Sequence, residues 1–269
     1  SYTFVSTADA FVLRGAVPVF VDIRPDTMNI DETKIEEAIT EKTKAIVPVH
    51  YAGVSCEMDK IMELAEKYHL LVIEDAAQGI MSTYKGKALG TIGDYGCFSF
   101  NGNKIITTSG GGILVCNLPE EKAKERVAKV RFWSTQAREK ARHYEHKEIG
   151  YNYRMSNIVA GIGRGQLKVI DERIAQKRHI FAYYQEHLGD LEGISFMPMH
   201  ENERPNCWLS VIELSDDCPV KPLDVMVALE QGDIESRPVW KPMHLQPVFA
   251  GYDYIDNGEV GKYLFEHGV

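Results

Sequence analysis

Along the first 115 residues, short runs of apolar residues alternate with stripes in which apolar residues recur every three or four positions. Short runs rich in branched side chains predict strands, and stripes with this spacing predict helices that bury one face. The predicted strands are 18–23, 45–49, 70–73, 95–100 and 111–116. Strands that alternate with helices favour an α/β architecture, in which a mostly parallel sheet is flanked by helices.

Two predicted helices separate the early strands. Asp31 precedes the first stripe and Ser55 precedes the second, and both are residue types that cap helix N-termini. The stripes consist of Ile35, Ala38 and Ile39 in the first helix, and of Met58, Ile61, Met62, Ala65 and Tyr68 in the second. One apolar stripe on each helix is expected to pack it against the sheet.

The pattern changes after residue 119, where charged residues become frequent. The elements predicted there are a charged helix with one apolar face at 122–131, an aromatic and basic loop at 132–149, a helix at 157–188, a strand at 208–214, a helix at 222–231 and an extended piece at 234–238. The mixture of strand and helix from about residue 190 onward is typical of a smaller α+β unit. We therefore expect a large domain over residues 1–165 and a smaller one over 166–269.

Composition narrows the class of protein. The chain has 269 residues, 44% hydrophobic and 26% charged, which is ordinary for a soluble globular protein. No apolar stretch approaches the roughly 20 residues that span a bilayer, and a net charge of −9 argues against nucleic-acid binding. Five cysteines without a C-x-x-C pair, with Cys97 and Cys116 in apolar runs, indicate reduced core residues of a cytoplasmic protein. His143 and His146 have no neighbours that complete a metal site, so no metal is expected.

Chemically active side chains follow the ends of two predicted strands. Asp75 lies two residues after strand 70–73, while Ser99 and Lys104 come at and just after the end of strand 95–100. Ligands of open α/β sheets bind beyond the carboxyl ends of the strands, so we expect these residues to meet. Burying an unpaired lysine is costly, but a lysine that forms a Schiff base with a carbonyl cofactor avoids that cost. The alternative is a surface lysine in a glycine-rich loop.

Three segments in order resemble a known signature: 74–78 (EDAAQ), 98–100 (FSF) and 101–104 (NGNK). Together they are similar to the DegT-like nucleotide-sugar aminotransferases, which have the aspartate-aminotransferase fold (PLP fold type I) and use pyridoxal 5′-phosphate (PLP). The resemblance extends over essentially the whole chain. It implies a nucleotide-sugar substrate, glutamate as amino donor and a homodimer with shared active sites. Members of the group are longer, so we expect an N-terminal segment and a C-terminal tail to be absent from this sequence.

The resemblance also implies roles for individual residues. Lys104 would bind the cofactor covalently and, once free, act as the base, while Asp75 would keep the pyridine nitrogen protonated. Ser99 would bind the cofactor's phosphate, and Asn103 belongs to the same cofactor-binding turn. Taken alone, Asp75 is also consistent with a helix cap, and Ser99 with a strand-end serine bonded to the backbone.

Four more positions match cofactor-binding positions of the group. Phe4 would stack on the cofactor ring, although it is also consistent with a core residue. Gln78 would lie near the phenolic oxygen or the ring face, where many members carry histidine. Asn152 and Arg154 match a motif that reaches across a dimer interface to the partner's cofactor phosphate.

Residues 237–244 resemble a segment of bacterial enzymes that aminate UDP-linked 4-keto-6-deoxy-N-acetylhexosamines in the N-acetylbacillosamine pathway. Arg237, Trp240, Lys241 and His244 would there bind the acceptor, since cationic side chains suit a diphosphate, but a surface Pro-rich turn is equally consistent with the pattern. The expected activity is amino transfer from glutamate to C4 of such a sugar. The alternatives are a GDP- or dTDP-linked keto sugar, and a non-catalytic PLP-binding protein, sensor or inactive fragment.

Overall fold

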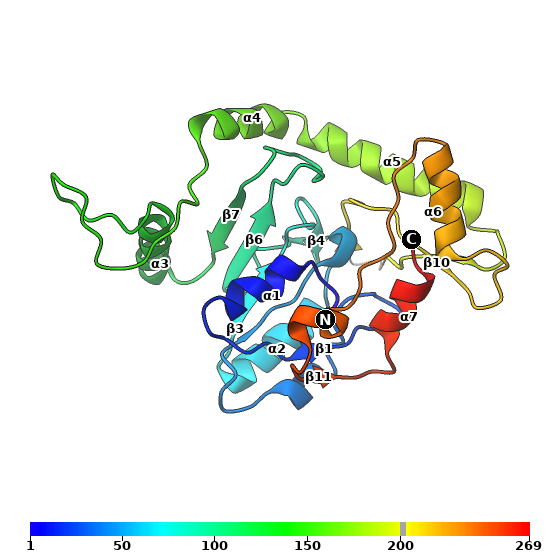
Figure 1. Cartoon of the computed structure of the whole chain (residues 1–269), viewed down its shortest axis with the longest axis horizontal. Helices are drawn as coiled ribbons and strands as arrows, with labels where there is room; N and C mark the ends of the chain where they lie inside the picture. The colour runs from blue at the N-terminus through cyan, green and yellow to red at the C-terminus, as the bar shows by residue number, and fades with distance from the viewer. Residues whose placement is uncertain (200–202) are drawn as a thin grey trace.

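Figure 1 presents the computed structural model of the chain, which describes residues 1–199 and 203–269. In chain order its elements are α1 (Val5–Val12), β1 (Phe20–Val21), η1 (Ile35–Ala38), β2 (Ala45–Ile46), η2 (Tyr51–Gly53), α2 (Met58–Tyr68), β3 (Leu71–Asp75), β4 (Thr83–Tyr84), β5 (Lys87–Ala88), β6 (Tyr95–Ser99), β7 (Gly112–Cys116), α3 (Glu120–Ser134), α4 (Asn157–Leu167), α5 (Ile170–Leu188), β8 (Ile194–Phe196), β9 (Glu203–Arg204), β10 (Ile212–Leu214), α6 (Pro222–Gln231), η3 (Met243–Leu245), η4 (Pro247–Phe249), β11 (Tyr254–Ile255) and α7 (Val260–His267).

The central sheet has the order β2-β3-β6-β7. Strands β2, β3 and β6 are parallel, and β7 pairs antiparallel with β6. The predicted α/β architecture with a mostly parallel sheet is therefore confirmed. In the register of β3 and β6, Asp75 lies opposite Cys97, so the carboxyl ends of both strands meet at one edge.

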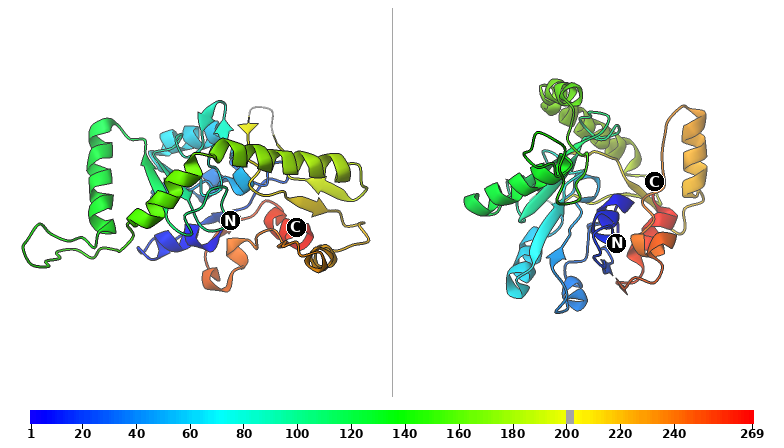
Figure 2. Two further views of the ribbon diagram at one scale, coloured as in Figure 1. Left: turned by 90° about the horizontal axis from the view of Figure 1, so that it is seen from above. Right: turned by 60° about the vertical axis from the view of Figure 1, so that its left-hand side comes forward.

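Helices cover both faces of this sheet. Figure 2 shows α2 and α3 on one face and α1 on the other. The apolar stripe of α2 packs on the sheet as expected, with Ile61 and Ala65 buried against Val72, whereas Tyr68 remains 37% exposed, so its expected burial is wrong. Tyr68 instead donates its hydroxyl hydrogen bond to Glu36 on the surface.

Several predicted elements are shorter than the hydrophobic pattern indicates. The strand at 18–23 is only β1, the strand at 45–49 is only β2, and the strand at 208–214 is only β10. Beyond β2 the ladder stops at Pro48, which has no N–H to donate, and resumes as a single bridge between Val49 and Asp75.

Both predicted N-caps are wrong. Asp31 accepts hydrogen bonds from the amide and hydroxyl of Thr33, which makes a local turn, and a four-residue 3₁₀ helix, η1, replaces the expected α-helix. Glu57 holds the N-cap position of α2, while the hydroxyl of Ser55 donates to the carboxylate of Glu203 at 2.8 Å. Polar side chains of this kind often bond locally or across the fold instead of capping.

The charged region also differs in detail. The helix predicted at 122–131 is the longer α3, which takes in the first residues of the predicted loop and has no buried residue among those described. The helix predicted at 157–188 is two helices, α4 and α5, which break at Lys168 and Val169. In both Figure 1 and Figure 2 the loop between α3 and α4 projects away from the rest of the chain.

Residues from the two predicted domains interleave. Strand β11 pairs in parallel with β1, and β9 pairs with β4. The carboxylate of Asp22, wholly buried, accepts the amides of Val260 and Gly261 at 2.9 and 3.0 Å and so caps the N-terminus of α7. The division at residue 165 stays a prediction.

The cysteines are all free thiols, but the expectation that Cys97 and Cys116 are core residues is wrong: Cys97 is exposed and Cys116 half-buried. Cys97 lies on β6, at the sheet edge where Asp75 also stands. Within the described residues, no helix combines the length and apolar character that a bilayer crossing requires. The same residues contain no cluster of three or more His, Cys, Asp or Glu side chains suited to a metal ion.

Candidate functional site

A cavity of about 1190 Å³ opens at the carboxyl ends of β3 and β6. Its wall is completed by α1, by the turn that follows β6 and by residues from the C-terminal third of the chain. The predicted site residues that line it are Phe4, Asp75, Gln78, Ser99, Asn103, Lys104, Arg237 and Trp240. The structure thus brings together side chains that are separated by more than 200 positions in the sequence.

Asp75 is held by its main chain and by its side chain. Its amide donates to the carbonyl of Pro48 at 2.8 Å, and its carbonyl accepts the amide of His50 at 3.1 Å. The carboxylate accepts the amide of Ala77 at Oδ1 (3.0 Å) and the hydroxyl of Thr7 at Oδ2 (2.6 Å). The acid therefore has a fixed position and two hydrogen-bond donors.

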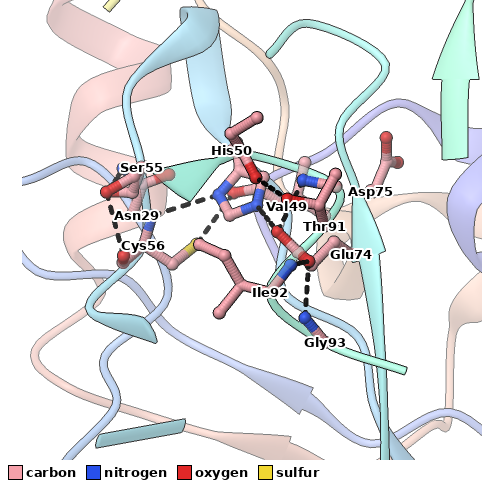
Figure 3. Close-up of polar contacts among 12 residues, drawn as sticks. Asn29, Val49, His50, Ser55, Cys56, Glu74, Asp75, Thr91, Ile92 and Gly93 are labelled. Carbon is pink, nitrogen blue, oxygen red and sulfur yellow. Dashed lines mark hydrogen bonds and ion pairs between the residues drawn. The ribbon is translucent and has the colours of Figure 1, made fainter. Parts of the chain in front are cut away.

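The buried carboxylate of Glu74 holds this strand end from the side of β3 opposite to Asp75 (Figure 3). Figure 3 shows Glu74 and Asp75 pointing to opposite sides of β3, as successive strand residues do. Glu74 has no solvent exposure, and its carboxylate accepts the amides of Gly90, Ile92 and Gly93, each at 2.7 Å, and the Nε2 of His50 at 2.9 Å.

The same bonds fix the protonation of the buried histidine. Cys56 donates its amide to Nδ1 of His50 at 3.2 Å, so Nδ1 carries no proton and Nε2 donates its proton to Glu74. Burial raises the pKa of Glu74, but the donors from His50, Gly93 and Gly90 outweigh burial, and the net pKa lies below its ordinary value. Glu74 is therefore a buried carboxylate that links β3, the segment after β2 and the loop before β6.

Lys104 stands in the turn after β6, with its side chain half-buried. Its Nζ lies 4.0 Å from the centroid of the Trp208 ring, an ammonium–aromatic contact. The indole of Trp208 also donates to the carbonyl of Asn103 at 2.8 Å and so holds the lysine turn. Burial lowers the pKa of Lys104 to about 8, and nearby Asp75 opposes part of that effect.

Three more predicted site residues line the cavity: Ser99 and Gln78 offer hydrogen-bond donors, and Phe4 offers an exposed ring. Ser99 accepts the amide of Asn101 at 3.3 Å, which leaves its hydroxyl proton available. Gln78 accepts the amide of Ala52 at 2.8 Å through Oε1, so its NH₂ group remains as a donor. Phe4 is 60% exposed at the N-cap of α1, and its ring is 6.2 Å from that of Trp240; it is therefore not a core residue.

Other predicted residues lie away from this cavity or are paired elsewhere. Asn152 and Arg154 are exposed on the segment before α4, where Asn152 bridges Thr135. Lys241 and His244 do not line the cavity, and the ring of His244 stacks on Tyr254 at 3.6 Å. The roles of these four residues stay predictions.

Arg237 reaches the cavity from its rim. Its guanidinium is largely exposed and pairs with Glu235 at 2.6 Å, so the pair is weak and free to exchange partners.

The residues of the cavity fit PLP. An amine whose pKa is about 8 at Lys104 suits reaction with the cofactor's aldehyde, and a carboxylate held by two donors at Asp75 suits a protonated pyridine nitrogen. The hydroxyl of Ser99, which accepts the amide of Asn101 and keeps its own proton, is a donor for a phosphate. The exposed ring of Phe4 offers a flat apolar surface.

Sequence reasoning missed Thr7 and Trp208, which both line the cavity. Thr7 comes one helical turn after Phe4, so a prediction of α1 would have indicated that the two share a face. Trp208 carries no such local signal, because its contact with Lys104 spans 104 positions of the chain.

Known proteins resemble this chain over most of its length. The model of the DegT/DnrJ/EryC1/StrS aminotransferase family matches residues 1–260. EpsN of Bacillus subtilis (strain 168), described as a candidate PLP-dependent aminotransferase, is 47% identical over all of this chain and 70% of its own length. The GDP-perosamine synthase of Caulobacter vibrioides is 40% identical over 93% of this chain and 66% of its own length.

Solved structures agree with the sequence relatives. The PLP-form of Spr1654 from Streptococcus pneumoniae, described as a candidate sugar aminotransferase, matches with a TM-score of 0.89 at 25% identity. The match covers 99% of this chain and 72% of Spr1654. The chain thus spans 66–72% of the length of these proteins.

Proposed function

This chain belongs to the DegT/DnrJ/EryC1/StrS aminotransferase family, and on that basis we propose that it transfers an amino group from glutamate to C4 of a UDP-linked 4-keto-6-deoxy-N-acetylhexosamine. As a family member it is a PLP-dependent aminotransferase of nucleotide sugars. The observation that carries the proposal is the presence of the Lys104 amine and the Asp75 carboxylate in one cavity.

Each of these side chains has a distinct task. PLP supplies an electron sink that stabilises negative charge on the carbon bonded to the transferred nitrogen. Lys104, with a pKa of about 8, is partly unprotonated near neutral pH, so its Nζ is able to accept a proton from that carbon of glutamate and return one to C4 of the sugar. Asp75 holds the proton on the pyridine nitrogen and so keeps the sink effective.

The rim of the cavity supports an anionic acceptor. The exposed guanidinium of Arg237 is suited to a diphosphate, for which it would exchange its surface partner Glu235. Trp240 offers an aromatic face beside Phe4 at which a sugar or base ring is able to pack. A uridine nucleotide rests on the resemblance of residues 237–244 to enzymes that use UDP-linked sugars.

A second candidate is amination of a GDP-linked keto sugar. It is favoured by one specific observation, the 40% identity to a GDP-perosamine synthase over 93% of this chain. The two candidates use the same residues around Lys104 and differ in the nucleotide and in the sugar that it carries.

We also propose a homodimer in which Asn152 and Arg154 contribute to the partner's active site. Both residues are exposed and lie away from the cavity of their own chain. The surrounding segments carry exposed apolar side chains, a feature typical of protein interfaces. These are Trp133, Ile149, Tyr153 and Ile158.

The substrate is tested with a panel of UDP-, GDP- and dTDP-linked 4-keto-6-deoxy sugars, each incubated with the protein, PLP and glutamate. Mass spectrometry of the amino sugar and enzymatic assay of 2-oxoglutarate measure the reaction. Preferred amination of the UDP sugar supports the first candidate, and preferred amination of the GDP sugar supports the second. A preparation that binds PLP at Lys104 and yet aminates no sugar of the panel contradicts both.

The shared site is tested by mixing two inactive variants, Lys104→Ala and Asn152→Ala. If Asn152 serves the partner's site, random pairing restores one intact site in half of the dimers, or about a quarter of wild-type activity. A mixture as inactive as its components, under conditions where native mass spectrometry of differently tagged variants detects exchanged dimers, argues against the shared site.

A further inference from the structure

We propose that Thr7 is a positioning residue for Asp75, whose carboxylate it fixes through a hydroxyl hydrogen bond from α1. The contact is short, with 2.6 Å between Thr7 Oγ1 and Asp75 Oδ2, and both residues line the cavity. The catalytic consequence rests on the proposed aminotransferase function, while the contact itself does not depend on it.

The direction of the hydrogen bonds follows from chemistry. A carboxylate only accepts, so the single hydroxyl proton of Thr7 is committed to Asp75. Thr3 lies 2.8 Å from the same hydroxyl, oxygen to oxygen, and therefore donates its own proton to Thr7. The result is a polarised chain from Thr3 through Thr7 to Asp75, and bonds in such chains strengthen one another.

Two donors on different oxygens fix the orientation of the Asp75 carboxylate. The amide of Ala77 bonds Oδ1 and Thr7 bonds Oδ2, so rotation of the carboxylate about its last torsion breaks both bonds. An ionised carboxylate with a fixed orientation is what a protonated pyridine nitrogen requires, and Asp75 faces the cavity in which the cofactor residues meet.

Helix α1 connects this support to the ring surface. Phe4 and Thr7 are one turn apart and both line the cavity, while Thr3, just before the helix, is buried. One short helix therefore carries an apolar face for the cofactor ring and the donor for the acid beside it. A substitution that keeps the helix but removes the hydroxyl separates these two tasks.

The test compares Thr7→Val, which removes the donor at almost constant shape, with Thr7→Ser, which keeps it. Both are loaded with PLP labelled with ¹⁵N in the ring, and the ¹⁵N chemical shift is followed with pH. We expect T7V to lose the ring proton at a pH at least one unit below that of the wild type, and T7S to titrate within half a unit of it. A role in packing alone moves neither titration.

Kinetics give a second readout. Loss of a hydrogen bond to a charged group reduces the rate at which glutamate converts bound PLP by about 10- to 100-fold in T7V. We expect KM for glutamate to change by less than about threefold, because the hydroxyl proton of Thr7 is already donated to Asp75, and T7S to retain the rate within about threefold. Thr3→Val is expected to have the same effect at smaller size, since it removes only the second link of the chain.

A T7V protein whose ring nitrogen titrates like that of the wild type overturns the proposal. If T7V does not fold, Thr7→Ala is compared with Thr7→Ser, and equal ring titrations in that pair overturn it as well. The ¹⁵N measurement needs only bound PLP. A wild-type protein that aminates no nucleotide sugar therefore contradicts the proposed function and leaves this test intact.

Discussion

Glu74→Gln is the substitution for which the structure allows the most explicit prediction. Each carboxylate oxygen accepts two donors: Oε1 accepts the amides of Ile92 and Gly93, and Oε2 accepts the amide of Gly90 and Nε2 of His50. Glutamine keeps one acceptor oxygen and replaces the other with an NH₂ group. Whichever way the amide is turned, two buried donors then face a donor.

The magnitude follows from these two lost acceptors. Leaving a buried donor unsatisfied costs about 1–3 kcal/mol, so the pair costs about 2–6 kcal/mol in the free energy of unfolding. His50 does not relieve the conflict by changing tautomer, since its Nδ1 would then lose the amide of Cys56. The free energy of unfolding of a typical domain is about 5–15 kcal/mol, so this loss is a large fraction of the total. It corresponds to a decrease in Tm of roughly 4–24 °C.

Urea unfolding followed by circular dichroism measures the effect, and thermal unfolding gives the Tm. Glu63→Gln is the matched control, because Glu63 is exposed on α2 and its carboxylate pairs with Lys60 at the surface. We expect the control to change the free energy of unfolding by less than about 0.5 kcal/mol. A loss below about 1 kcal/mol in E74Q would refute the reasoning, since the four bonds would then not determine stability.

The pH dependence provides an independent check with a defined sign. The pKa of Glu74 lies below its ordinary value of 4.5, so its stabilising contribution is complete above pH 4.5 and is lost as the pH falls through the folded-state pKa. Glutamine does not titrate. The difference in stability between wild type and E74Q should therefore narrow below pH 4.5, and a constant difference down to acid unfolding contradicts the assignment.

Three further predictions concern the cavity. Lys104, with a pKa of about 8, is about 10% unprotonated at pH 7, compared with about 0.03% for an ordinary lysine. In the PLP-free protein, the NMR titration of its ¹³C-methylated amine should therefore have its midpoint near pH 8. A midpoint near pH 10.5 contradicts this prediction. Because burial lowers that pKa, the stability of the PLP-free protein should rise between pH 8 and 10.5, where the unfolded chain still holds the proton. Trp208→Leu removes the aromatic face and should lower the midpoint of the Lys104 titration by about 0.5–1.5 pH units, whereas Trp208→Phe keeps an aromatic face and should keep most of the wild-type midpoint. Equal midpoints in Trp208→Leu and the wild type would exclude an energetic role for the contact. Asp75→Asn should reduce amino transfer by more than about 100-fold with PLP content within about twofold of wild type, and an unchanged rate removes the role of Asp75.

The sequence predicted the parts of the site that depend on local pattern. Strands β3 and β6 are apolar runs followed by polar residues, and parallel pairing then brings their ends together at Asp75 and Ser99. Lys104 follows from the same rule, because it lies in the turn directly after β6. For these residues the position along the chain determines the position at the sheet edge.

The rest depends on contacts that no local pattern contains. Helix α1 has a sequence rich in β-branched and small polar residues, which favour helices only weakly, and it is stabilised by packing of Ala8 near Phe20 and Phe249. Without the helix, Thr7 has no reason to be considered. The sequence pattern predicts a strand that begins at Trp208 and gives no role to its side chain. In the structure the indole donates a hydrogen bond that holds the turn of Lys104.

The bond between Asp22 and the first turn of α7 spans 238 positions, so a charge made early in synthesis accepts amides that are made much later. Until those residues have left the ribosome, Asp22 has to stay hydrated, because an unpaired carboxylate is costly to bury. The nascent chain is thus unable to seal β1 inside as it emerges. We therefore expect β1 to become buried only after the first turn of α7 has been synthesised.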